Sequence, residues 1–514
     1  MVVLWVSRVG LLAAVVLPLA GGVTGRLRRG SSGCARLSWA AAVSALTVTA
    51  LVAIRGPDTV SVGGVLRLVA DPVSAVVLVL VTGVGAVVQS FSTRYLQSDP
   101  SSERFAWRVG AVVTAMTLVA ASGDLAGLVV GWTAAGLAFL GVLSYRKDLP
   151  GVVSCARALR RALVVGDGCL LLAAGLVWAR AGNVRLGSPH ALGVAATELG
   201  AWHGPVAVLV TVAALARGAQ GAFSRWLPQT VSAPTPSCAL LHAGVVNGGG
   251  ILLVRLGALG AWAPAMAGLL VVSGATAVRA SLLARRQADV KGKLAYSTMA
   301  QMGFMLAECA VGAYAAAVIH LVGHGCYKAS LFFSSGSAVR RPGQLGARAV
   351  VALRPGAWGA AASLAVAAAV VPGLMLGDGA VLALYAAVTA AALAGAVWSS
   401  LPEGTGSGRA RWSALLLAAA AGYGAVVAAI GRFLARGAAT PVGTVDAWWL
   451  GALAVAAVAA ARMAHRGRWA AAIGGRLLDA GAPVQGCDGL FRGRPLAGAP
   501  AATTATLVVE GRAA

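Results

Sequence analysis

Residues 313–336 read AYAAAVIHLVGHGCYKASLFFSSG, an apolar run of membrane-spanning length that contains three ionisable side chains. His320, His324 and Lys328 recur every fourth residue, so a helix places them along one face over roughly two turns. Ionisable groups at membrane depth are energetically expensive and usually face a polar path. The run therefore predicts a membrane helix that lines a route for protons or cations. The alternative is that each group simply hydrogen-bonds to a neighbouring helix.

Lysine is rare in this chain, and its placement supports the first interpretation. Lys and Arg together number 41, yet only four are lysines, at positions 147, 291, 293 and 328. Lys328 alone lies inside an apolar run. A desolvated ammonium can lose its proton, whereas a guanidinium effectively cannot. A retained lysine therefore predicts a site that must exchange a proton.

Composition places the whole chain in a bilayer. Of its 514 residues, 59% are hydrophobic and 11% charged, whereas soluble domains carry about 25% charged residues. The net charge of +25 comes from short basic clusters between apolar runs, without a basic face interleaved with aromatic residues. We therefore expect no nucleic-acid partner and an all-α polytopic membrane protein with roughly 14–15 transmembrane helices.

Apolar length and flanking charge predict fifteen spans. They are 2–21, 38–54, 72–93, 107–121, 124–144, 161–179, 204–220, 238–256, 260–280, 294–310, 313–336, 357–376, 379–398, 411–431 and 444–462. The loops after odd-numbered spans are the basic ones, so the positive-inside rule places the N-terminus outside a bacterial inner membrane and the C-terminus in the cytoplasm. The first span also resembles a signal peptide, but its only charge, Arg8, lies within the apolar run, which favours a membrane helix.

The same pattern predicts four parts of the chain. Residues 1–106 form N-terminal transmembrane helices, 107–400 a conducting core, 401–462 C-terminal transmembrane helices, and 463–514 a mostly disordered cytoplasmic tail rich in Gly, Pro, Arg and Ala.

Prolines interrupt the apolar region at two places. Pro228, Pro234 and Pro236 lie at the first, and Pro372 at the second. Broken helices at membrane depth are tolerated only where protein or water lines them, and paired breaks indicate a transport site. We expect helix breaks at both places.

Two further polar residues are candidates for the path. His242 follows the first break and is either a relay or a structural histidine. Glu308 lies in an apolar span near a helix end, where it either joins the path or extends to the membrane surface.

Asp167 and Arg217 are the remaining candidates for the path. Asp167 lies near Arg160 and Arg161, which suggests a local ion pair with them. Arg217 closes an apolar run, so an end-of-helix arginine is as good an interpretation as a path-lining charge.

Motifs of metal binding and covalent catalysis are missing from the sequence. The seven cysteines are scattered, without C-x-x-C pairs or Cys/His ligand spacing, and there is no phosphate-binding glycine motif, H-E-x-x-H or catalytic triad. We expect no metal, no cofactor and no catalytic residue, hence a transporter subunit rather than an enzyme, unless the chain serves within a respiratory translocase.

Four stretches resemble the large antiporter-like subunits of respiratory complex I (NuoL), the Mrp antiporters and the DabB inorganic carbon transporter. They are Gly131-Trp132, residues 219–244 (AQGAFSRWLPQTVSAPTPSCALLHAG), residues 289–298 (DVKGKLAYST) and residues 320–337 with the His-His-Lys series. The resemblance implies a core of two inverted five-helix repeats, each with one broken helix, and a mid-membrane proton path of Lys and His residues.

Within that family, residues 301–305 (QMGFM), Cys309 and residues 327–337 look most like DabB. Proteins of this type work with DabA, a large peripheral zinc protein related to carbonic anhydrases, and take up inorganic carbon using a cation gradient. The resemblance thus implies a DabA-like partner that carries the zinc site.

The chain also departs from the family pattern. Thr133 follows the Gly-Trp pair where respiratory subunits have Glu, Arg217 stands where the family has Lys, and Val164 replaces an arginine. An arginine is a poor proton relay because it stays charged. Asp378 lies near the second break, but no second-half Lys or acid has a definite counterpart.

Three functions remain open. The first is a DabB-like subunit, coupled to H⁺ or Na⁺, of a CO₂ or bicarbonate uptake complex. The second is a proton-translocating L-type subunit of NADH:quinone oxidoreductase or an Mrp-like antiporter subunit. The third is a membrane scaffold that conducts nothing.

Overall fold

The computed structural model describes residues 2–338, apart from 28–30, 65, 147, 149–150 and 288, together with residues 425, 429–430 and 432–434. The helices are α1 (Val2–Leu27), α2 (Ser31–Arg55), α3 (Pro72–Tyr95), α4 (Ser102–Ala121), α5 (Leu125–Leu143), α6 (Val152–Ala181), α7 (Pro189–Glu198), α8 (His203–Arg217), α9 (Trp226–Gln229), α10 (Thr235–Ala243), α11 (Gly248–Leu256), α12 (Ala263–Arg286), α13 (Val290–Ala310) and α14 (Tyr314–Ala338). A short hairpin of β1 (Asp58–Val62) and β2 (Leu66–Ala70) joins α2 to α3.

Nine helical segments in this part of the chain are long and apolar enough to cross a membrane. The predicted all-α polytopic membrane architecture is therefore confirmed. The expected spans 357–376, 379–398 and 444–462, most of 411–431, the break at Pro372 and the tail lie outside the described residues.

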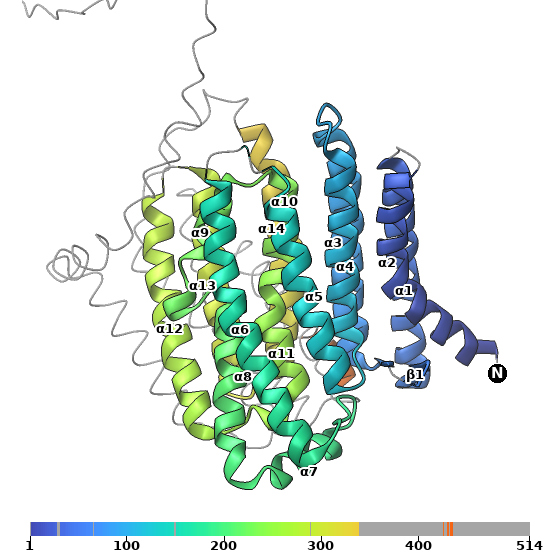
Figure 1. The fold of residues 1–514 in the computed structure, drawn as a ribbon, viewed down its shortest axis with the longest axis vertical. Coiled ribbons are helices and arrows are strands. Elements are labelled where there is room, and N and C mark those ends of the chain that lie inside the picture. Colours follow the sequence, from blue (N-terminus) through green and yellow to red (C-terminus); the bar gives the residue numbers. More distant parts are fainter. Residues whose placement is uncertain are drawn as a thin grey trace, which may run out of the picture.

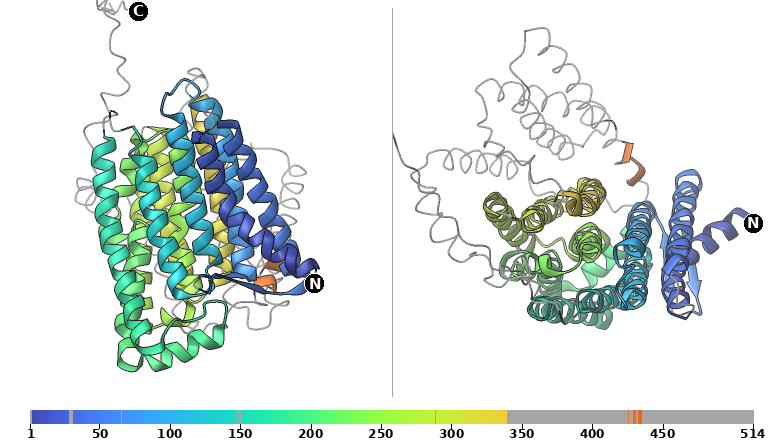
Figure 2. Two further views of the ribbon diagram at one scale, coloured as in Figure 1. Left: turned by 45° about the vertical axis from the view of Figure 1, so that its right-hand side comes forward. Right: turned by 90° about the horizontal axis from the view of Figure 1, so that it is seen from above.

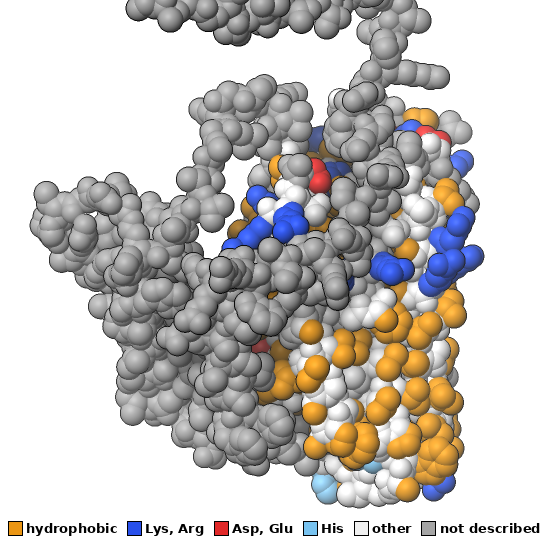
Figure 3. Space-filling model, turned by 90° about the vertical axis from the view of Figure 1, so that its left-hand side faces the viewer, with side chains coloured by type: hydrophobic (Ala, Val, Ile, Leu, Met, Phe, Trp, Pro, Cys, Tyr) orange, Lys and Arg blue, Asp and Glu red, His pale blue; other side chains and the backbone are white. Residues whose placement is uncertain are grey.

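The helices stand side by side as a bundle (Figure 1). Helices α1 and α2 lie at one edge, where they pack on α3 and α4, and α4 connects this edge to α5 and the rest (Figure 2). On the opposite flank, hydrophobic side chains cover much of the lower surface, and most of the visible Lys and Arg side chains lie above them (Figure 3). Such a distribution suits a lipid-facing belt below a polar boundary.

Single aspartate residues mark where several helices begin. Asp71 forms a capping box with Ser74 at the start of α3, and Pro72 occupies the first turn. Asp124 and Asp289 cap α5 and α13, where each accepts a hydrogen bond from a backbone N–H, that of Gly127 and of Gly292 respectively. A carboxylate at this position satisfies otherwise unpaired backbone N–H groups and complements the helix dipole.

Arg146, in the loop between α5 and α6, joins this loop to the one between α3 and α4, at the end of the bundle opposite the hairpin. It forms ion pairs with Asp99 at 3.0 Å and with Asp148 at 2.7 Å. The hydrogen bond from Arg146 lowers the pKa of Asp148, while burial, followed by the charge of Asp99, raises the pKa of Tyr145 above its ordinary range.

The span from Thr235 to Leu259 runs through the interior and is almost wholly enclosed by protein. The sequence predicted one continuous helix over 238–256. Instead, Gly244 leaves helical geometry with φ −124° and ψ −78°, and a short 3-10 turn over Val245–Asn247 separates α10 from α11. The interruption leaves backbone groups without helical hydrogen-bond partners. Because the span is enclosed, these groups face protein rather than lipid.

Candidate functional site

The predicted face of α14 is buried inside the bundle. Side chains of His320, His324 and Lys328 are 8%, 6% and 2% exposed, respectively. Helix α14 packs against α3, α10, α11 and α13, so this α14 line (His320, His324, Lys328) faces protein rather than lipid. The fourfold spacing therefore places three ionisable groups along one interior track.

Glu308, on the last turn of α13, continues this track. Its Oε2 lies 3.0 Å from Nδ1 of His320, and its side chain is 5% exposed. The alternative that Glu308 extends to the membrane surface is wrong, because the neighbouring α14 offers a buried partner twelve residues along the chain. An ionised carboxylate can only accept, so it holds a proton on Nδ1 and leaves Nε2 of the ring for exchange.

His242 approaches the α14 line from α10. Its ring stacks on Phe332 of α14 with centroids 4.6 Å apart and an interplanar angle of 14°. The two helices come this close because α14 has Gly325 at the crossing, where a Cβ would lie 2.9 Å from the carbonyl oxygen of Ala243. His242 thus lies beside the α14 line, directly before the interruption at Gly244.

Replacing Gly325 with alanine is expected to destabilise the protein by about 1–3 kcal/mol, because the added methyl group overpacks the crossing of α14 and α10. Gly323→Ala is the matched control on the same helix: its Cβ would meet nothing within 4 Å, so a neutral or slightly stabilising effect is expected. Thermal unfolding in detergent compares the two variants. Equal stability of the two variants would contradict the close approach of α14 and α10 at Gly325.

Lys328 is held by the early turns of α13. Its Nζ donates to the carbonyl oxygen of Leu294 at 3.2 Å and to the hydroxyl of Ser297. Ser297 was not predicted as a site residue, although it lies within the family-like stretch 289–298. The only sequence signal was its place on the helix preceding the histidine series.

Buried ring nitrogens allow the α14 line to take up and release protons. His320 and His324 each have an Nε2, and His242 an Nδ1, without a hydrogen-bond partner in the described part of the chain. The rings of His320 and His324 have centroids 6.1 Å apart. Imidazole can take up a proton on one nitrogen and release one from the other, so neighbouring rings at this separation can pass a proton through one water molecule.

A second buried charge cluster lies away from the α14 line. Arg217, at the end of α8, donates to Asp167 Oδ1 at 2.9 Å and to the carbonyl oxygen of Trp132 at 3.1 Å. Its guanidinium lies over the Trp132 ring, 4.1 Å from the centroid, and the indole Nε1 donates to the same Asp167 oxygen at 2.8 Å. We call these three residues the Arg217 cluster.

The Arg217 cluster corrects the sequence interpretation of Asp167. The expected local pair with Arg160 or Arg161 is wrong. All three residues lie on α6, where the arginines precede Asp167 by nearly two turns, and the Arg160 side chain is exposed. The real partner is fifty residues away. Arg217 is 3% exposed, so it is also not an arginine that extends from a helix end to the surface.

The chain is interrupted at the prolines of the first expected break, and the interruption begins earlier than they do. Helix α8 already ends at Arg217, and Ala219 adopts a left-handed backbone with φ +56°. Beside it, Gln220 donates to the carbonyl oxygen of Met299 on α13 at 3.1 Å. Pro228 lies in the four-residue helix α9, while Pro234 immediately precedes α10 and Pro236 lies in its first turn. The interruption thus starts next to the Arg217 cluster.

Comparison with known proteins finds two matching family models. The family described as NADH:quinone oxidoreductase/Mrp antiporter, TM, matches residues 122–354, and that described as NADH-ubiquinone oxidoreductase (complex I), chain 5 N-terminus, matches residues 64–106. Among solved structures, the Mrp complex from Dietzia sp. is similar with a TM-score of 0.56 and 24% identity, over 94% of this chain and 61% of that chain. An archaeal membrane-bound sulfane sulfur reductase is similar with a TM-score of 0.59 and 17% identity, over 83% of this chain and all of the other. These two likenesses concern the fold.

Curated relatives include a probable inorganic carbon transporter subunit DabB1 from Halothiobacillus neapolitanus, 35% identical over 277 residues, which are 52% of this chain and 49% of the relative. A DabB subunit from Bacillus subtilis is 33% identical over 53% of this chain and 54% of its own length. NADH-quinone oxidoreductase subunit L from Mycobacterium tuberculosis is 31% identical over 52% of this chain and 43% of its own length. The chain thus spans about half the length of the curated relatives it matches.

Proposed function

Because the chain belongs to the antiporter-like membrane subunits of the complex I and Mrp family, we propose that it is a DabB-like subunit that couples cation movement to inorganic carbon uptake. The observation that carries the cation part is the buried series of Glu308, His320, His324 and Lys328. The carbon part is supported by relatives at 33–36% identity that are named probable inorganic carbon transporter subunits.

In this proposal a proton moves along the α14 line. It exchanges between Glu308 and Nδ1 of His320, leaves from the opposite ring nitrogen, and reaches His324. Lys328 then takes it up beside Ser297, whose hydroxyl orients the amine. His242 supports the transfer by its position next to the line, since its own Nδ1 also has no partner in the described residues.

The Arg217 cluster takes no part in proton release in this proposal. Arginine stays charged, and here it is fixed by a carboxylate, a carbonyl oxygen and an aromatic face at once. We infer that Asp167 and Arg217 anchor α6 to α8, and that translocation depends on the α14 line.

We further propose that the chain lies in a bacterial inner membrane with its N-terminus outside, and that a large peripheral, zinc-binding DabA-like protein is its partner. The described helices supply the membrane part, and the zinc chemistry would belong to the partner. Reporter fusions at the N-terminus and in the loop between α12 and α13 test the orientation.

A growth assay separates the candidate functions. The chain is expressed with its candidate partner in cells that need inorganic carbon uptake to grow at ambient CO₂. We expect growth with the native chain and with His190→Ala, an exposed histidine on α7, and loss of growth with His324→Ala. Undiminished growth with His324→Ala would favour a scaffold. Co-purification with respiratory subunits instead of a zinc protein would favour the L-type function.

A further inference from the structure

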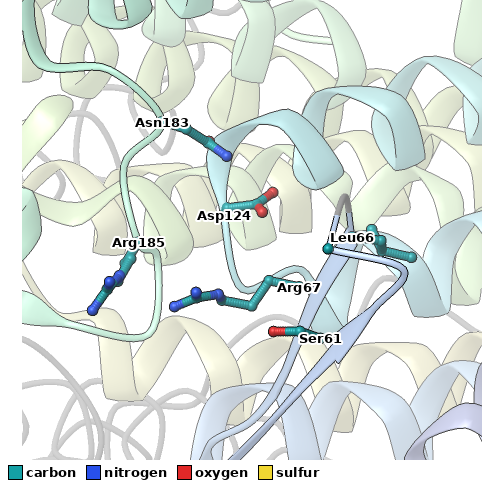
Figure 4. Close-up of a pocket in the computed structure, with 7 residues that line it drawn as sticks. Ser61, Leu66, Arg67, Asp124, Asn183 and Arg185 are labelled. Carbon is teal, nitrogen blue, oxygen red and sulfur yellow. The ribbon is translucent and has the colours of Figure 1, made fainter.

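A polar pocket lies at the end of the molecule that carries the hairpin, outside the α14 line. It has a volume of about 230 Å³. Three segments far apart in the sequence meet there: the β1–β2 hairpin, the link from α4 to α5, and the loop after α6 (Figure 4). Its polar lining residues are Ser61, Arg67, Asp124, Asn183 and Arg185.

The pocket is built on a rigid backbone. Gly123 N donates to the carbonyl oxygen of Arg67 at 2.8 Å, and Leu186 N donates to the carbonyl oxygen of Gly123 at 3.1 Å. These bonds, with a third from Leu125 to Val184 at 3.1 Å, extend the hairpin into a small irregular sheet across the three segments. The backbone positions that carry the lining side chains are therefore held relative to one another.

Strand pairing brings two arginines to the lining of the same pocket. Ser61 is opposite Arg67 in the hairpin, and Asp124 is opposite Arg185 in an isolated bridge, so each pair shares one face. The Arg67 side chain extends from β2 toward the loop that carries Arg185 (Figure 4). Gly123 makes room for it, because a Cβ there would lie 2.7 Å from Arg67 Cγ.

The pocket has an uncompensated positive charge. Neither Arg67 nor Arg185 forms an ion pair within the described part of the chain. Asp124 is the single acidic lining residue, and its Oδ1 is engaged by Gly127 N at 2.8 Å as the cap of α5. Two guanidinium groups against one carboxylate leave a net positive site, which attracts an anion.

We propose that this pocket binds an oxyanion, either a small free ion such as bicarbonate or phosphate, or the phosphate of a lipid headgroup. Each guanidinium offers a planar fork that matches two oxygens of such a group. Asn183 accepts from Ala126 N through its oxygen, so its amide NH₂ is available as a third donor. The volume admits a small ion or a single headgroup phosphate. This site does not depend on the proposed cation path.

Ligand titration of the full-length protein in detergent tests the site. Bicarbonate and inorganic phosphate are added separately, with chloride at matched ionic strength as reference, and thermal unfolding reports binding. We expect Arg67→Gln and Arg185→Gln each to weaken binding at least about tenfold. Arg55→Gln, an exposed arginine at the end of α2, should bind like the native protein. Asn183→Ala keeps all charges and should weaken binding less.

Native mass spectrometry of the same samples identifies the source of the oxyanion. A phospholipid retained by the native protein and by Arg55→Gln, but lost from both pocket variants, would assign the pocket to a lipid phosphate. A response to free ions without retained lipid would assign it to a soluble oxyanion. If neither binding nor retention depends on Arg67, Arg185 or Asn183, the proposal is wrong. Asn183→Ala preserves this conclusion where an arginine variant fails to fold.

Discussion

Lys328→Arg is expected to reduce cation translocation at least about a hundredfold while the protein still inserts and assembles. Arginine keeps the positive charge and the hydrogen-bond donors that now reach Leu294 and Ser297. It does not release a proton at physiological pH. The substitution therefore separates two roles of Lys328: a fixed charge, which arginine replaces, and a proton carrier, which it does not.

Lys293→Arg is the matched control. It makes the same chemical change at a lysine that is exposed on the neighbouring α13. Proton uptake into vesicles that contain the assembled complex, followed with a pH-sensitive dye, gives the rate. We expect the control to keep the native rate. A native rate in Lys328→Arg, with normal assembly, would mean that Lys328 acts only as a fixed charge.

The sequence predicted the α14 line because its information is local. A spacing of four on a membrane helix fixes the shared face of His320, His324 and Lys328 without knowledge of any other element. The burial of all three confirms that this face points inward. The partners of the line were harder to predict: Glu308 was identified as a candidate, but its contact with His320 depends on how α13 packs against α14.

Long-range contacts explain the wrong predictions. Asp167 was assigned to nearby arginines because sequence proximity was the only available guide, whereas packing of α6 against α8 brings it to Arg217. The break at Gly244 has no proline to mark it, since glycine tolerates the unusual backbone without a local signal. The sequence also does not predict the proposed oxyanion pocket, because Arg67 and Arg185 are 118 residues apart and only strand pairing brings their segments to one pocket.

Asp167→Asn is expected to cost about 3–5 kcal/mol of stability, the largest structural effect that we predict. The substitution keeps the shape and the oxygen that accepts from Trp132, but it leaves the guanidinium of Arg217 without its carboxylate. Arg217 is 3% exposed, so water cannot replace the lost partner. A buried charge that loses its counter-ion is far more costly than a neutral pair.

A double-mutant cycle distinguishes an ion pair from simple packing. Asp167→Asn combined with Arg217→Gln removes both charges, so the double variant should recover part of the stability that the single Asp167 variant loses. Arg160→Gln, on the exposed side of α6, should keep the free energy of unfolding within about 0.5 kcal/mol of the native value. Chemical unfolding in detergent micelles measures all five proteins: the native protein, the two single variants of the pair, the double variant and Arg160→Gln. Additive losses in the cycle would show that the two charges do not stabilise each other, and the Arg217 cluster would then be no anchor between α6 and α8.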